Sequence, residues 1–412
     1  MNRRIKNILI LHLLIIIFYG LLIKQVRAEL SLRGFADTYR AVQTESPNDY
    51  LGARTRLRLE GLFESDQSAA FASVNAVQNE VVTSETGVDL MESYLEYTSE
   101  NWDARLGKQI IIWGKGDGLQ VTDIISPKDY SEFLARDFDD TRLGVDALKL
   151  RWLGDNSDLE FIWIPSFREA VTPTTESPWY VEKQLDYSTV EYNDAIKPEN
   201  RIKNSEIALK YSLYLSGVDL AFSLFNTWND LPTMYYDVSG DTITFSPEYH
   251  RLNFGAFEFS MSLGEVILWG EIARFKGRYY ETDASDDQFL IKDSVDTLLG
   301  LDWNPGGGWS ASLQVFNSSI LDYEKSIQED ENDGLAKLYI SKTLLREQLK
   351  LYTSIFYGMN KQDLFNQTAF DYALTDNLHV FAGVDVFSGD KEGDFGQYED
   401  NDEIWFKAKY SF

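Results

Sequence analysis

The chain of 412 residues contains no cysteine and only three histidines. The lack of cysteine excludes disulfide bonds and thiolate metal sites, so hydrogen bonds and packing must hold the fold together. Basic residues are also scarce: 38 Lys plus Arg stand against 66 Asp plus Glu, which gives a formal net charge of −28. Such acidity argues against a nucleic-acid partner, because phosphate groups require a basic surface.

Long apolar runs are missing after residue 23, which excludes a membrane protein built of helices. The start of the chain differs, since a basic stretch at 3–6 precedes an apolar run at 8–23, and a cleavage-like motif ends at Ala28. We interpret residues 1–28 as a secretory signal peptide that is cut near Ala28. A retained anchor is the alternative, although this run is shorter than the roughly 20 residues that a spanning helix needs.

Aromatic side chains and short alternating runs are abundant. Phe, Trp and Tyr make up 14% of the chain, whereas proline contributes only 9 residues. The runs "WSASLQV" (309–315) and "LHVFAGVDV" (378–386) alternate apolar and polar residues with period two. This pattern predicts β-strands with one apolar and one polar face. Eighteen such runs fit between residue 30 and residue 412, so we predict an all-β protein.

The connections between these runs alternate between short and long. Short turns include "SG" (216–217) and "TDN" (375–377), while the longest connections are 114–142 and 168–202. This asymmetry is typical of an outer-membrane barrel, with short periplasmic turns and long extracellular loops. We therefore predict an antiparallel transmembrane β-barrel of about 18 strands over residues 29–412, located in the outer membrane of a Gram-negative cell. The sheet must close, because an open edge in hydrocarbon leaves backbone groups unpaired.

The stretch "ARTRLRLE" (53–60) has an arginine at every second position. In a strand, this spacing puts the arginines on one face and Leu57 and Leu59 on the other. We expect the leucines to face lipid and the basic residues to line a pore. If the last strand lies beside the first, two lysines join the basic strip at the closure seam. The predicted pore-lining residues are Arg54, Arg56, Arg58, Lys407 and Lys409.

An alternative interpretation is that the three arginines only stiffen the barrel. In that case they would pair with Glu60, Glu92 and Glu96 on nearby walls. Rows of charge often neutralise locally, and both interpretations stay open from the sequence alone.

Three motifs carry a resemblance to a known family: "LGKQ" (106–109), "WGKGDG" (113–118) and "DIISPKD" (123–129). Together with the C-terminal "FGQYEDNDEIWFKAKYSF", they resemble a porin-like family of Gram-negative outer membranes. Many of its members are labelled as domains of unknown function, and their layout is similar to that of alginate-export and other anion or sugar porins. The resemblance implies an 18-stranded barrel that lets small solutes diffuse. The last strand, which ends at Phe412, also resembles the signature read by the barrel-insertion machinery.

By the same analogy, residues 114–142 are expected to fold inward as the third extracellular loop and to narrow the channel. An acidic loop facing a basic wall would create a transverse field that filters ions. The alternative is an exposed loop that only keeps the surface soluble. The charged residues predicted to form this constriction are Lys115, Asp117, Asp123, Lys128, Asp129, Arg136, Asp137, Asp139, Asp140 and Arg142.

These observations favour a porin or export conduit for passive diffusion of small polar solutes, with anions as one option. A structural or adhesive barrel and an outer-membrane hydrolase are the alternatives. A hydrolase needs a Ser–His–acid set, and neither His250 nor His379 has a nucleophilic serine pattern beside it. We therefore expect no enzymatic activity, no metal and no cofactor. Outer-membrane lipid, lipopolysaccharide and the insertion machinery are the expected partners, and both a homotrimer and a monomer stay open.

Overall fold

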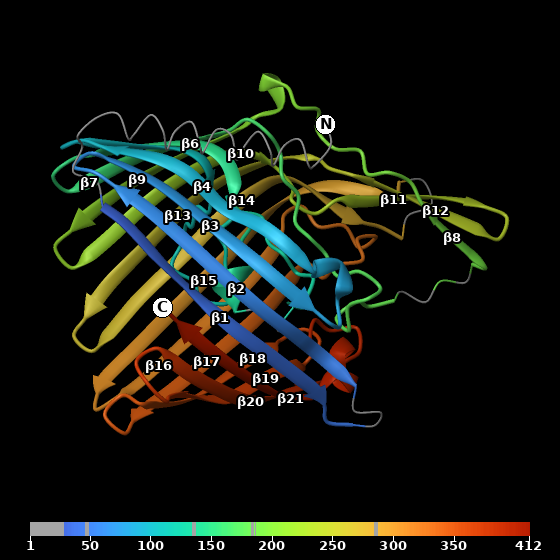
Figure 1. The fold of residues 1–412 in the computed structure, drawn as a ribbon. Helices are drawn as coiled ribbons and strands as arrows, with labels where there is room; N and C mark the ends of the chain where they lie inside the picture. The colour runs from blue at the N-terminus through green and yellow to red at the C-terminus, as the bar shows by residue number, and fades with distance from the viewer. Residues whose placement is uncertain (1–28, 46–48, 134–136, 183–184, 186, 284–286) are drawn as a thin grey trace.

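Eighteen antiparallel strands form one closed sheet (Figure 1). The computed structural model describes residues 29–45, 49–133, 137–182, 185, 187–283 and 287–412. Each barrel strand is hydrogen-bonded to its neighbours along the chain, and the first strand pairs with the last. The predicted all-β barrel of 18 strands is confirmed. The predicted signal peptide, residues 1–28, lies outside the described residues.

The bounds of the barrel strands follow the sequence pattern closely. They are β1 (Glu29–Gln43), β2 (Tyr50–Glu64), β3 (Ser68–Asn79), β4 (Gly87–Thr98), β5 (Trp102–Gln109), β6 (Val145–Leu153), β7 (Ser157–Ile164), β9 (Glu206–Leu215), β10 (Val218–Trp228), β13 (Arg251–Leu263), β14 (Val266–Glu281), β15 (Phe289–Gly306), β16 (Trp309–Ile320), β17 (Asn332–Leu344), β18 (Leu349–Gly358), β19 (Asp363–Ala373), β20 (Leu378–Ser388) and β21 (Glu403–Ser411). Within the described residues, no helix is long and apolar enough to cross a membrane.

The two faces of each strand follow from the period of two. In β2, Arg54 and Arg56 are buried, while Leu57 and Leu59 are exposed. A closed sheet has one inner and one outer face, so the leucines point outward and the arginines point into the barrel.

The closure seam brings an acidic residue between two basic ones. In the register of β1, Asp37 lies opposite Arg56 of β2 on one side and Lys409 of β21 on the other. Tyr39 lies in the same way between Arg54 and Lys407. The seam therefore carries the basic strip on both flanks of β1.

Two connections are longer than the sequence indicated. Strand β5 ends at Gln109 rather than at residue 113, so the connection to β6 spans 110–144 instead of 114–142. The strand stops there because side chains take over its backbone donors: Ile110 N–H binds Glu92, and Ile111 N–H binds Ser126 Oγ. The connection between β7 and β9 spans 165–205 instead of 168–202.

A second, three-stranded sheet lies beyond the rim of the barrel, on the side of the long connections (Figure 1). It consists of β8 (Thr189–Tyr192), β11 (Thr233–Ser239) and β12 (Thr242–Glu248). The sequence analysis did not predict this sheet, because its strands lie within long connections.

Candidate functional site

Residues 110–144, which we call the crossing segment, connect opposite walls of the barrel. The segment binds β2 at one end and β14 at the other. These two strands are nine steps apart in the ring of 18, counted through β3, β4, β5, β6, β7, β9, β10 and β13. Apolar side chains such as Ile111 and Leu119 pack against the inner wall at Phe225 and Leu298. The segment therefore lies across the interior.

The tip of the crossing segment is fastened to a buried carboxylate, an arrangement that we call the tip anchor. Glu271 of β14 is only 2% exposed. Its Oε1 accepts the backbone N–H groups of Lys115 (2.5 Å) and Gly116 (3.1 Å). Its Oε2 accepts the N–H groups of Val121 (3.2 Å) and Thr122 (2.9 Å), and also the Thr122 hydroxyl (2.9 Å). Five neutral donors thus surround one carboxylate.

Two glycines of the "WGKGDG" motif make this tip possible. Gly114 and Gly118 both have φ near +84°, a region that favours glycine. A Cβ atom at Gly114 would lie 2.5 Å from Thr122 Oγ1 and 2.7 Å from Glu271 Oε1. The motif is therefore a tight turn that fits around the carboxylate. A larger residue at Gly114 would push Thr122 or Glu271 out of place.

A second contact holds the tip to the neighbouring wall. The carbonyl oxygen of Asp117 accepts hydrogen bonds from Lys337 Nζ of β17 (2.6 Å) and from Gln314 Nε2 of β16 (3.0 Å). The Asp117 carboxylate lies 3.6 Å from the same lysine but is mostly exposed.

The other end of the crossing segment is held by the arginine row, an arrangement that we call the arginine anchor. Arg54 binds Glu132 at 2.6 Å, and Arg56 and Arg58 share Asp140 at 2.8 Å each. Arg56 also binds Asp37 of β1 at 2.6 Å. A neighbouring contact joins Lys407 to Asp137 at 2.5 Å.

The arginines determine the charge state of Asp140. Burial disfavours the ionised form, but the guanidinium groups of Arg56 and Arg58 outweigh it and hold the pKa of this carboxyl well below its usual range. Asp140 is therefore ionised at neutral pH.

The partners named in the alternative interpretation of the arginine row are wrong. Glu60 binds Arg33, Glu96 binds Arg105, and Glu92 accepts the Ile110 N–H. The arginines are paired, but chiefly with carboxylates from the crossing segment and from Asp37. The basic row and the acidic segment are in direct contact rather than facing each other across an open lumen.

The remaining predicted residues of the segment have different surroundings. Asp123 binds Arg142 at 2.8 Å and lies 3.9 Å from Lys128, while Asp129 accepts bonds from Ser131. Lys115 is exposed. On the wall, Lys409 lies over the Phe35 ring at 4.3 Å. Arg136 lies outside the described residues, and so does the side chain of Asp139.

The connection 165–205, which we call the outer loop, packs on the crossing segment. Tyr130 N–H binds the Val171 carbonyl at 2.7 Å, and Val171 N–H binds the Lys128 carbonyl at 2.9 Å. Further along, Trp179 is 1% exposed and packs against Phe387 at 5.7 Å and Tyr398 at 5.5 Å. The outer loop therefore reaches from β7 to the connection between β20 and β21.

Sequence reasoning missed Glu271 and Trp179 as functional residues. Glu271 occupies an ordinary inward position of its strand, and only the glycines of "WGKGDG" hinted at a shaped turn. Trp179 lies in the long connection 168–202, and no local pattern there marked it.

His250 and His379 have separate surroundings. His379 Nδ1 lies 2.8 Å from Asp371, and His250 stacks on Tyr279 at 3.8 Å. Within the part of the chain that the structure describes, no serine hydroxyl is hydrogen-bonded to either ring. In the same residues, no group of three or more metal-ligating side chains is close enough to hold an ion.

A family model described as "Protein of unknown function (DUF1302)" matches residues 24–325, which is more than half of the chain. The chain belongs to this family. The predicted resemblance to a porin-like family of unknown function is confirmed.

Solved outer-membrane barrels are similar in fold. OccAB3 of Acinetobacter baumannii is 12% identical, with a TM-score of 0.53, and the match covers 94% of this chain and 99% of that chain. A loop-deletion mutant of OmpT, an outer membrane protein of Vibrio cholerae, is 9% identical with a TM-score of 0.48 over 93% and 99% of the two chains. OmpF of Salmonella typhi, in complex with daunomycin, is 11% identical with a TM-score of 0.47 over 93% and 97%. A comparison with curated proteins gave no match. The match to OccAB3 shows that the chain has the fold of an outer-membrane β-barrel.

Proposed function

We propose that the protein is a passive channel of the outer membrane for small polar solutes, and that the crossing segment sets its bore. One observation carries the proposal: the segment is bound to β2 through Arg56 and to β14, on the opposite wall, through Glu271. Wall side chains do not fill a barrel of this strand number. A segment fixed across the interior therefore controls the free cross-section.

The charge pairing supports a weak ion preference. Arg54, Arg56 and Arg58 are each bound to a carboxylate, so they add little net charge to the lumen. The anion preference that the arginine row suggested is therefore expected to be small. A reversal potential measured across a salt gradient tests this expectation, and a strong preference for one ion contradicts it.

Single-channel conductance of the full chain in planar bilayers tests the proposal. Replacing residues 114–142 with a short Gly-Ser link should raise the conductance and shift the reversal potential towards anions, because Arg54 and Arg58 lose their carboxylate partners. Because such a variant can fail to fold, Glu271→Ala serves as the milder change that releases only the tip. A parent protein that folds but does not conduct would favour a structural or adhesive barrel. Unchanged conductance in both variants would assign the constriction to the outer loop.

The cellular setting is part of the same proposal. Residues 1–28 act as a signal peptide cut near Ala28, and the C-terminal strand addresses the chain to the insertion machinery. N-terminal sequencing of the purified protein tests the cut. Fractionation with lipopolysaccharide and a heat-dependent shift in electrophoretic mobility test the membrane location. Cross-linking in native membranes distinguishes a homotrimer from a monomer.

A further inference from the structure

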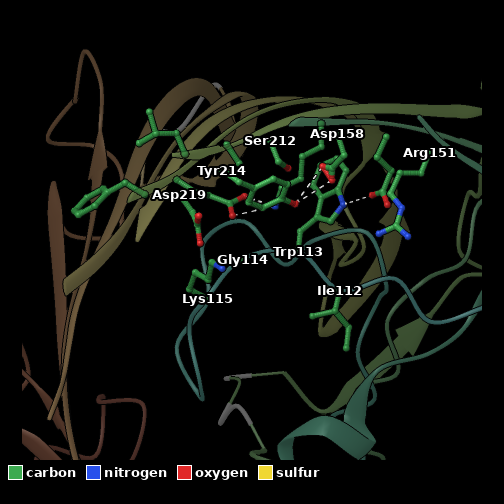
Figure 2. A pocket seen from close by; sticks show the side chains of 15 residues that line it. Ile112, Trp113, Gly114, Lys115, Arg151, Asp158, Ser212, Tyr214 and Asp219 are labelled. Atoms are coloured by element: carbon green, nitrogen blue, oxygen red, sulfur yellow. Dashed lines mark hydrogen bonds and ion pairs between the residues drawn. The ribbon is translucent and has the colours of Figure 1, made fainter. Parts of the chain in front are cut away.

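A cavity of about 200 Å³ lies beside the tip of the crossing segment. It is lined by Ile112 to Lys115 of the segment and by inner faces of β6, β7, β9, β10 and β13. Figure 2 shows these side chains converging on one space, with Lys115 and Asp219 at the end of the view away from Arg151.

Most of the polar groups around the cavity are already bound to one another. Lys210 Nζ contacts both oxygens of Glu258, at 2.8 and 2.9 Å. The Trp113 indole N–H donates to Glu160 at 2.7 Å, as a dashed line in Figure 2 marks. These pairs make a rigid wall, because each side chain is fixed by its partner.

Tyr214 and Arg151 complete this paired wall. The Tyr214 hydroxyl donates to Asp158 at 3.1 Å, and Arg151 binds Asp103 at 2.8 Å. These groups already have partners and are therefore poor candidates for holding a passing solute.

Two charges of opposite sign differ from the rest. Among the described residues, neither the Lys115 ammonium nor the Asp219 carboxylate has an ion pair or a side-chain hydrogen bond, and both line the cavity. The backbone of Lys115 is nevertheless held in place, because its N–H donates to Glu271. Asp219 is fixed by its place in β10, where it lies opposite Tyr214.

We infer that this cavity is a subsite for a small zwitterion, a solute that carries one ammonium and one carboxylate group, as an α-amino acid does. The inference rests on the proposed channel function and names a preferred solute class for it. The solute carboxylate would meet Lys115, and its ammonium would meet Asp219.

Other solute classes fit this pair of charges less well. An anion would meet Lys115 but would also lie against Asp219, whereas a cation would have the reverse difficulty. A neutral solute would leave both charges without a partner. Because both side chains are partly in contact with water, each pairing is weak, which suits a channel whose solutes must also leave.

Two probes of nearly equal size test the inference: L-alanine, which is a zwitterion, and lactamide, which is neutral. Both carry no net charge, so swelling of proteoliposomes reports their flux without a membrane potential. At low solute concentration, the parent protein should pass alanine about two- to fivefold faster than lactamide, the factor expected for a weak charge pairing.

Lys115→Gln and Asp219→Asn should each lower this ratio towards one, because each change should reduce alanine flux more than lactamide flux. The exchanged pair, Lys115→Asp with Asp219→Lys, should restore the ratio, because the two charges are still present with their places reversed. As a control, Lys361→Gln with Glu392→Gln removes an exposed ion pair of the outer connections and should leave the ratio unchanged.

Three outcomes would overturn the inference. A parent ratio of one shows that the cavity does not recognise a zwitterion. A loss of alanine flux in Lys115→Gln but not in Asp219→Asn shows an anion subsite instead. Equal loss of both fluxes shows that the side chains only shape the bore. Lactamide flux itself separates these results from a failure of the channel proposal, since a barrel that passes neither probe is not a channel.

Discussion

The two anchors of the crossing segment hold carboxylates in opposite ways. At the arginine anchor, Glu132 and Asp140 come from the segment, and their partners are cations of β2. At the tip anchor, Glu271 comes from the wall, and its partners are neutral backbone N–H groups and one hydroxyl. The first anchor pairs opposite charges, whereas the second surrounds a carboxylate with the dipoles of peptide groups and one hydroxyl. One end is thus held by electrostatic pairing and the other by the shape of a turn.

The largest effect is expected from Glu271→Ala, which removes the acceptor of all five donors of the tip anchor. Each donor left without a partner costs about 1–3 kcal/mol unless water replaces the carboxylate. The tip should detach and the single-channel conductance should rise. Glu271→Gln keeps the shape of the side chain but replaces one acceptor oxygen with a donor, so its conductance should lie between those of Ala and the parent. An Ala variant that conducts as the parent does would show that shape at the tip does not control the bore.

A smaller effect is expected from Asp140→Asn at the arginine anchor. Arg56 keeps Asp37 and Arg58 keeps Asn75 as partners, so the segment should stay in place with little change in conductance. The loss of one negative charge should instead shift the reversal potential towards anions. Asp137→Asn is the matched control, because that carboxylate is 56% exposed and pairs with Lys407, and its shift should be smaller. A large rise in conductance in Asp140→Asn would mean that the two anchors do not differ as described.

The pH dependence sharpens the same contrast. A carboxyl whose pKa is lowered in the folded state stabilises the fold above its unfolded pKa of about 3.9, and this contribution is lost as the pH falls through the folded value. The pKa of Asp140 is lowered by Arg56 and Arg58 against the effect of burial. Asp140 should therefore contribute no change in reversal potential between pH 7 and about pH 4. Its contribution should change only in more acidic solution. The part of the change in reversal potential that is missing in Asp140→Asn is due to this carboxyl. If that part occurs near pH 5, the pairing is weaker than the geometry indicates.

The smallest effect is expected from Lys337→Met, which removes one of the two donors to the Asp117 carbonyl. Gln314 still donates to that oxygen at 3.0 Å, so the free energy of unfolding should fall by about 0.5–1.5 kcal/mol. Conductance should change little, because the five bonds to Glu271 remain. Urea unfolding of the barrel in lipid vesicles measures the difference. The control is Lys342→Met, in the same strand, whose Nζ donates to the Gly307 carbonyl rather than to the tip. An effect as large as that of Glu271→Ala would show that the main contact of the tip is with β17 rather than with β14.

The sequence predicted the wall better than the contents of the barrel. Alternation in runs such as 309–315 depends only on neighbouring residues, and strand β16 spans Trp309–Ile320 as the pattern indicated. The partners of Arg56 and Arg58 could not be found in this way, because Asp140 lies 84 and 82 residues further along the chain. Nothing local in β14 distinguishes Glu271 from other inward-facing acids. The strand that ended early, β5, did so because side chains of Glu92 and Ser126 captured its donors.

The outer loop has a consequence for the order in which the molecule forms. The Tyr398 hydroxyl donates to the Trp179 carbonyl, and Asn401 Nδ2 donates to the Pro178 carbonyl, across separations of 219 and 223 residues. Contacts so distant along the chain form slowly, because the entropy of closing a large loop must be overcome before they add stability. Trp179 therefore reaches its aromatic surroundings only after the β20–β21 hairpin is in place. During refolding, the fluorescence of this indole should be among the last signals to settle, after the strands themselves have formed.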